Sequence, residues 1–159
     1  MISLSLPSSS RSVSFWFSIN ELPKGRLRVA NFFNYNLVVE NNLIFLNESD
    51  KFEVVPNKWY NVILVVNDKM TSCTGYFDGK QLLQSNSAPN ESFIKFDHES
   101  EFDCEVKNNK SSLGLKFGSA SVNPVQWYIG GAIRIYSQLL QNDAIESIYS
   151  SGVLNTIKG

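Results

Sequence analysis

Apolar and polar residues alternate along much of the N-terminal half of the chain. Within residues 11–20, every second side chain from Val13 to Ile19 is apolar, and the residues that alternate with them are serines and one tryptophan, Trp16. Strict alternation puts one set of side chains on each face of a β-strand, so this segment predicts a strand with one face in a core. Similar patterns predict further strands at residues 26–33, 36–40, 42–46, 52–55, 113–117 and 125–136.

The segment from residue 60 to residue 66 is apolar on both faces apart from Asn61, which predicts a central strand covered on both sides. Two dipeptides predict hairpin turns between strands. Asp78-Gly79 lies between two apolar runs, and Asn41-Asn42 separates two of the short strands. Glycine and asparagine tolerate the positive φ angles that such turns need.

One amphipathic helix is predicted, at residues 142–151. Ile145, Ile148 and Tyr149 recur at helical spacing and form one apolar stripe. Gln141 or Asn142 begins the helix, asparagine being the better N-cap residue, and Gly152 is the expected residue after its end. Short strands followed by one late helix predict an all-β antiparallel sandwich.

The length and charge of the chain narrow the possibilities. Its 159 residues fit a single domain over residues 1–159, with a long polar loop at about 84–112. The formal net charge of −1 argues against nucleic-acid binding, and no apolar run is long enough for a transmembrane segment. Strand-like residues begin at Ile2 without signal-peptide features, so we expect a domain cut from a larger protein.

The two cysteines, Cys73 and Cys104, leave two interpretations open. They are either reduced and partly buried thiols, because cysteine is among the most buried residue types, or a disulfide, which would favour secretion.

Two blocks of sequence carry a family resemblance. KWYNVILVVNDKMTSCTGYFDGK, at residues 58–80, resembles the middle of concanavalin A-like, laminin G-type jelly rolls, and IGGAIRIYSQLLQNDAIESIYSSG resembles their final strand and helix. The closing block, with Trp127-Tyr128-Ile129-Gly130, is also similar to the concanavalin A-like domain of BEACH-family proteins. The Pro-rich continuation of that family is absent here, where Gly152-Val153-Leu154 follows the helix.

The resemblance implies a concanavalin A-like jelly roll with one short C-terminal helix and no enzymatic activity or cofactor. It implies a module of a large cytoplasmic membrane-trafficking scaffold, peripheral to membranes, which contacts protein or lipid or docks intramolecularly. The alternative is an extracellular laminin G-type module that binds glycan or protein. A glycoside hydrolase is the more remote alternative.

The acidic segment at residues 97–105 is the candidate for charged contacts. Glu99, Glu101 and Asp103 would lie on one face of a strand, where they would meet a basic partner, and two carboxylates are also what a glycoside hydrolase requires. The simpler interpretation is a solvated acidic loop or edge. His98, the only histidine of the chain, is expected to be exposed within it.

Aromatic and basic side chains supply the other candidates. Trp16, on the serine face of its strand, would stack on a sugar ring or anchor a protein partner, unless that face is covered. Lys24, Arg26 and Arg28 alternate and would form a basic strip for anionic lipid, or an ordinary solvated edge.

Two further expectations concern the core and calcium. Trp59 and Trp127 flank apolar strands and are expected in the core. The turn at Asn67-Asp68 offers oxygen atoms for calcium but has no second aspartate at matching spacing, and Asp78 is explained by its hairpin.

Overall fold

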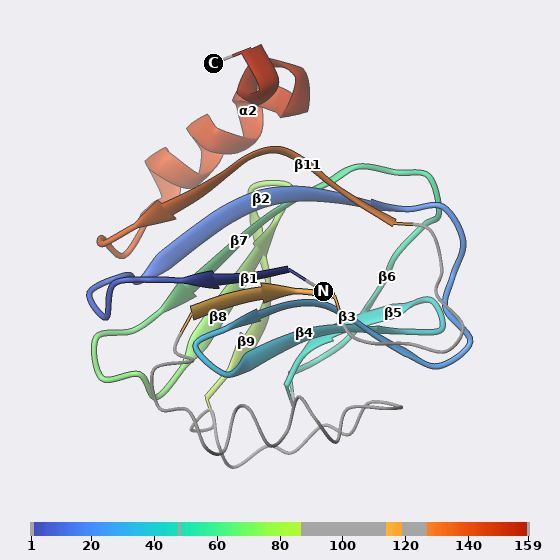
Figure 1. The fold of residues 1–159 in the computed structure, drawn as a ribbon, viewed down its shortest axis with the longest axis horizontal. Helices are drawn as coiled ribbons and strands as arrows, with labels where there is room; N and C mark the ends of the chain where they lie inside the picture. Colours follow the sequence, from blue (N-terminus) through green and yellow to red (C-terminus); the bar gives the residue numbers. More distant parts are fainter. Residues whose placement is uncertain (1, 48, 87–113, 119–126, 159) are drawn as a thin grey trace.

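The β-strands of the computed structural model form a sandwich around one hydrophobic core (Figure 1). The structure describes residues 2–47, 49–86, 114–118 and 127–158. Within them, the six-stranded sheet has the order β1 (Ile2–Ser5), β10 (Gly114–Phe117), β3 (Arg26–Phe32), β4 (Tyr35–Glu40), β5 (Leu43–Leu46) and β6 (Phe52–Glu53). The five-stranded sheet has the order β11 (Trp127–Tyr136), β2 (Ser12–Ile19), β7 (Tyr60–Val66), β8 (Cys73–Phe77) and β9 (Lys80–Ser85). All these neighbours pair antiparallel, which confirms the predicted fold class.

Aromatic rings join the two sheets across the core. Phe15 of β2 meets Phe117 of β10 edge to face, with ring centroids 5.0 Å apart and ring planes at 83°. Phe77 of β8 meets Phe52 of β6 in the same way at 4.8 Å. Phe15 is fully buried, and edge-to-face pairs stabilise beyond the area they bury.

The hairpin predictions at Asn41 and at Asp78-Gly79 are confirmed. Asn41 has a φ of 56° between β4 and β5, and Asp78 and Gly79 have φ angles of 52° and 81° between β8 and β9. A third turn was not predicted. Phe33 was expected in a strand, but β3 ends at Phe32 and Phe33 lies in the turn before β4. Its φ of 48° is a strained conformation that its burial in the core holds in place.

The central position of β7 is also confirmed, because both of its faces are buried. Val62 and Leu64 face the core between the sheets. Asn61 and Ile63 point to the outer face of the five-stranded sheet and are fully buried there too. The helix α2 (Asn142–Lys158) lies over this outer face (Figure 1).

The helix begins where expected but extends further than predicted. The carbonyl of Gln141 accepts the N–H of Ile145 at 3.0 Å, so Gln141, the weaker of the two candidates, is the N-cap residue. Gly152 leaves the helical conformation with a φ of 73°, as the sequence predicts, and a second helical segment then continues to Lys158. This short second segment was not predicted, because the glycine was taken as the end of the helix.

The long polar loop lies mostly outside the described residues, although Gln84 and Ser85 belong to β9. Of the helices in the described part of the chain, none has the length and hydrophobicity that spanning a membrane requires.

Replacing Phe15 with alanine should lower the free energy of unfolding by about 3–5 kcal/mol, because it removes a buried ring and leaves a cavity between the sheets. Urea unfolding followed by circular dichroism measures the loss. The control is Leu82→Ala on the edge strand β9, where the side chain is 45% exposed and the loss should stay near 0.5 kcal/mol, roughly the surface value. Equal losses would contradict an inter-sheet role for Phe15.

Candidate functional site

Three residues form a row across the outer face of the five-stranded sheet, at the end where β11 begins. The register pairs Tyr128 of β11 with Ser18 of β2. It also pairs Phe17 with Tyr60, so one further step brings Trp59 opposite Ser18. The N–H of Asn57 donates to the carbonyl of Ile19 at 2.7 Å, so the two segments stay side by side beyond the ladder.

The alternation of side chains gives the direction of this row. Tyr60, the first residue of β7, faces the core, and if the alternation is continued back by one residue, Trp59 is directed to the outer face. Trp127 and Ile129 pack against the core, so Tyr128 between them is directed outward as well. The row of Tyr128, Ser18 and Trp59 is called the aromatic slot below.

The two aromatic residues of the aromatic slot are exposed, and the serine between them is covered. Tyr128 is 48% exposed and Trp59 is 38% exposed, whereas Ser18 between them is only 4% exposed. Adjacent strands lie about 4.8 Å apart, so the two aromatic residues start from backbones about 10 Å apart. The side-chain amide of Asn20 donates to the Tyr128 hydroxyl at 3.3 Å and supports that side chain.

The exposure of Trp59 corrects the prediction that it lies in the core. Trp59 follows a turn at Pro56-Asn57 and precedes the first residue of β7. In Figure 1 the start of β11, beside this end of the sheet, extends past α2. The sequence could have indicated that Tyr128 faces outward, because Tyr128 alternates with Trp127 and Ile129, which face the core. Trp127 packs against the core as expected.

Trp16 lies in the next row and is covered by α2. Its ring stacks with that of Tyr149, with centroids 6.1 Å apart and planes at 26°, and Trp16 is 7% exposed. The sequence left open whether Trp16 is accessible or covered. In the structure it is covered. Tyr149 itself remains 39% exposed beside the aromatic slot.

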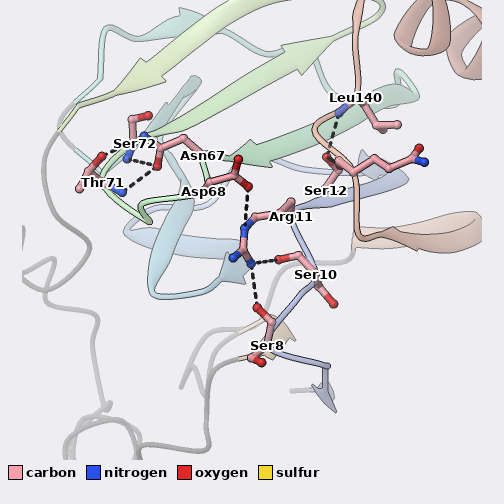
Figure 2. Close-up of polar contacts among 10 residues, drawn as sticks. Ser8, Ser10, Arg11, Ser12, Asn67, Asp68, Thr71, Ser72 and Leu140 are labelled. Carbon is pink, nitrogen blue, oxygen red and sulfur yellow. Dashed lines mark hydrogen bonds and ion pairs between the residues drawn. The ribbon is translucent and has the colours of Figure 1, made fainter.

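A shallow pocket of about 290 Å³ lies near the N-terminal end of α2. It lies between the turn from β7 to β8 and the chain that leads into the helix (Figure 2). Amide, hydroxyl and aliphatic side chains line it: Val65, Asn67, Ser72, Thr74, Tyr76, Leu139, Leu140, Gln141 and Asn142. The lining holds no carboxylate, histidine or thiol, so it suits a neutral ligand.

The walls of this pocket are fixed by hydrogen bonds (Figure 2). The Asn67 amide oxygen accepts the N–H groups of Thr71 at 2.8 Å and Ser72 at 3.1 Å. On the opposite wall, the Ser12 hydroxyl donates to the Gln138 carbonyl at 2.6 Å and accepts the Leu140 N–H at 3.3 Å.

The oxygen atoms of the turn considered for calcium, Asn67-Asp68, are engaged by other groups of the protein. The amide oxygen of Asn67 already accepts two N–H groups. The Asp68 carboxylate faces the Arg11 guanidinium at 3.5 Å, and a cation beside the carboxylate opposes a second cation. Among the described residues, no three His, Cys, Asp or Glu side chains are grouped to hold a metal.

The basic strip does not form at the surface. Arg26 is exposed and pairs with Glu40 at 2.6 Å. Arg28 is only 2% exposed, on the outer face of the six-stranded sheet, and its Nε donates to the Asn36 side chain at 3.0 Å. Only Lys24 and Arg26 of the predicted strip therefore remain accessible.

The remaining candidates lie outside the described residues or in the core. Glu99, Glu101, Asp103, His98 and Cys104 are outside the described residues, so the predictions for them stay predictions. Burial raises the pKa of the Cys73 thiol, and a fully buried, neutral thiol is not a nucleophile.

Similarity to known proteins is limited to structure. No protein-family model matches the sequence, and no curated protein does. Solved structures with a similar fold include the sialidase of Trypanosoma rangeli, with a TM-score of 0.57 and 16% identity over 89% of this chain. They also include botulinum neurotoxin type C, which interacts with two ganglioside molecules, with a TM-score of 0.58 and 17% identity. The binding domain of botulinum neurotoxin DC, in complex with rat synaptotagmin II, matches with a TM-score of 0.58 and 18% identity.

These similarities define a β-sandwich fold. This chain spans 22% of the sialidase and 35% of each toxin chain. Because the identities are this low, the likeness concerns the fold alone. The neighbours include binding domains and enzymes, so a binding module is compatible with the fold.

Tyr35 gives a pH-dependent prediction. Burial, followed by the nearby Cys73 thiol, raises its pKa from 10.0 to about 12. The unfolded chain therefore loses this proton first, so the stabilisation is complete below pH 10 and falls as the pH approaches 12. Relative to a Tyr35→Phe variant, the wild type should lose about 2 kcal/mol of unfolding free energy over this range.

Urea unfolding at a series of pH values measures that difference. Between pH 7 and 9 the difference between the two proteins should stay constant, which is the internal control. A constant difference up to pH 12 would show that the Tyr35 hydroxyl is not held protonated by the fold.

Proposed function

We propose that this chain is a non-catalytic interaction module that binds its partner through the outer face of the five-stranded sheet. The observation that carries this proposal is the aromatic slot, with Tyr128 and Trp59 both more than a third exposed. Tyrosine and tryptophan are enriched among the residues that dominate binding energy at protein interfaces. They offer large rigid surfaces and a polar edge at little cost in conformational entropy.

The chemistry of this face supports binding over catalysis. Most glycosidases need two carboxyl groups about 5–9.5 Å apart. The aromatic slot and the neighbouring pocket are built instead from aromatic, hydroxyl, amide and aliphatic groups. The sialidase neighbours share only the fold with this chain, whereas the toxin binding domains are examples of the same architecture used for recognition.

A protein is the partner that the aromatic slot favours. The sequence resemblance extends this to a module of a BEACH-type trafficking scaffold, in the cytoplasm and peripheral to membranes. Intramolecular docking and contact with anionic lipid belong to the same proposal. On this view, the acidic residues Glu99, Glu101 and Asp103 add contacts to a basic partner.

A second candidate is an extracellular glycan-binding module of the laminin G type. The pocket beside the N-terminal end of α2 favours it, because its neutral hydroxyl and amide lining matches the hydroxyl groups of a sugar. The neurotoxin that interacts with gangliosides has the same architecture.

The proposal predicts that the strongest ligands from an unbiased screen depend on the aromatic slot. A displayed library of extended peptides and a glycan array would both be screened with the wild-type chain. Ligands should bind a Trp59→Ala, Tyr128→Ala double variant about tenfold more weakly or worse, because two exposed anchors are lost. Leu82→Ala, which removes an exposed apolar side chain from the far edge strand, should bind normally.

Two results would contradict the proposal. Retention of all selected ligands by the double variant would move the binding site elsewhere. Turnover of a fluorogenic sialoside or an oligoglucan by the purified chain, lost on substitution of Glu99 or Glu101, would make it a hydrolase.

A further inference from the structure

The first segment of α2, residues 142–151, is held to the sheet by few apolar contacts. Within this segment, which the structure describes in full, Ile145 is the one fully buried side chain. Ile148 is half-buried, and Tyr149 is 39% exposed although its ring stacks on Trp16. Isolated helices shorter than about 12–15 residues are marginal in water. The segment therefore depends on this small set of contacts to stay folded on the sheet.

Two polar atoms beneath α2 are buried without a hydrogen bond. Trp16 of β2 and Asn61 of β7 lie directly opposite each other, and both are buried on the outer face of the sheet. Within the described part of the chain, no group bonds the indole nitrogen of Trp16 or the amide oxygen of Asn61. The first is a donor and the second an acceptor, and burying either without a hydrogen bond is unfavourable. The helix therefore covers this face at a cost that opposes the contacts of Ile145 and Tyr149.

Tyr149 holds the last turn of the segment in place. Its ring lies 6.1 Å from that of Trp16, measured between the centroids. On the hairpin between β8 and β9, a Cβ at Gly79 would lie 3.3 Å from the same ring, so the glycine leaves room for it. Gly152 interrupts the helix three residues after Tyr149. Loss of the Tyr149 contacts therefore frees the end of a short segment, not the middle of a continuous helix.

The face beneath the segment fits a helix, because it now holds one. Small serines beside Trp16 on β2 let a helix approach closely. A helix that docks in such a place does so through side chains at i and i+4, which here are Ile145 and Tyr149. A second helix with the same two kinds of side chain, and with a hydroxyl or amide group for Trp16 and Asn61, would also satisfy the two polar atoms.

We propose that the first segment of α2 is a releasable cover, and that the face beneath it binds an amphipathic helix of a partner protein in its place. The inference goes beyond the proposed function, because it concerns the covered part of the outer face and not the aromatic slot. The partner helix carries an aliphatic and an aromatic residue four positions apart, as Ile145 and Tyr149 are. Release and binding are coupled, since one face cannot hold both helices.

Hydrogen exchange of the whole chain tests the release of the helix. The amides of residues 145–149 should exchange about a hundredfold faster than those of β7, because they open locally while the sandwich stays folded. Tyr149→Ala should raise their exchange about three- to tenfold further, which corresponds to the loss of one aromatic pair. Leu82→Ala, at an exposed position of the edge strand β9, should leave it unchanged.

A disulfide can lock the helix onto the hairpin. A Cβ at Gly79 would lie 3.7 Å from the Cβ of Tyr149, within the separation of about 3.5–4.5 Å that a disulfide needs. The variant Gly79→Cys, Tyr149→Cys, made in a chain with Cys104→Ser, is locked when oxidised and releasable when reduced. Both forms carry a side chain at the positive φ of Gly79, so they are compared within one protein.

The probe is a labelled peptide with the sequence of residues 138–152, which offers the helix of this chain as a separate molecule. Fluorescence anisotropy should show that the reduced variant binds it about tenfold more tightly than the oxidised variant, or better. A matched peptide with Tyr149→Ala should bind the reduced variant about tenfold more weakly, because it cannot stack on Trp16. The Tyr149→Ala chain should bind the first peptide more tightly than the wild type does, which tests the inference without the disulfide.

Three outcomes would overturn the inference. The first is exchange of the helix amides no faster than that of the β7 amides, because the helix would then open only when the whole domain unfolds. The second is equal binding of the peptide by the reduced and oxidised forms and equal binding by Tyr149→Ala and wild type. The third is a dimer of the reduced variant on size-exclusion chromatography, which would make the helix of a second copy the occupant.

These results are independent of the aromatic slot. If any of the three occurs while ligands from the unbiased screen depend on Trp59 and Tyr128, this inference fails and the proposed function stands. If the helix is released and the peptide binds, but the double variant keeps its ligands, the proposed function fails and this inference stands.

Discussion

Strand β2 is buried along its whole length, and this requirement shapes the rest of the domain. Its apolar face packs against the six-stranded sheet through aromatic rings such as that of Phe15. Its other face carries serines at positions 12, 14 and 18 and Trp16. Trp16 and the serines before it cannot stay buried without a cover, and α2 and the chain before it supply that cover from Ser12 to Trp16. The serine side chains are small, so the helix and the segment before it can approach the sheet closely. The Ser12 hydroxyl makes two hydrogen bonds to that segment, with Gln138 and Leu140.

The alternation of the first strand, and the glycine and asparagine turns, were sufficient to predict the sandwich. Local chemistry decides such features, since Asp78-Gly79 reverses the chain wherever it lies between two strands. The second helical segment was missed because Gly152 was interpreted as the residue that ends the helix, although Val153, Leu154 and Ile157 beyond it recur at helical spacing. Phe33 was assigned to a strand because aromatic residues favour strands, and only the packing of the core can hold such a residue at a positive φ.

For the candidate site residues, too, the sequence predicts the strand but not whether a side chain on it is exposed. Arg26 and Arg28 have the same spacing in sequence that exposed residues of an edge strand would have, yet one is exposed and the other is buried beside Asn36. That difference depends on what lies over each face, which a single strand cannot specify. The exposure of Trp16, left open by the sequence, and that of Trp59, predicted wrongly, depend on the same kind of cover. The helix covers the first and stops short of the second, and neither fact is encoded in their own strands.

The end of the first helical segment explains why Trp59 and Tyr128 remain exposed. From the contact of Leu140 with Ser12 to the stack of Tyr149 on Trp16, α2 follows β2 over four residues of the strand. Covering the next row, at Ser18, would require about 7 Å more, or four to five further helical residues. Gly152 interrupts the helix only three residues after Tyr149, with a φ of 73°. The first helical segment therefore ends before it reaches Tyr128 and Trp59. A substitution that restored helical geometry at Gly152 would extend the cover toward the aromatic slot, so this glycine, far from the slot in sequence, sets the boundary of the exposed surface.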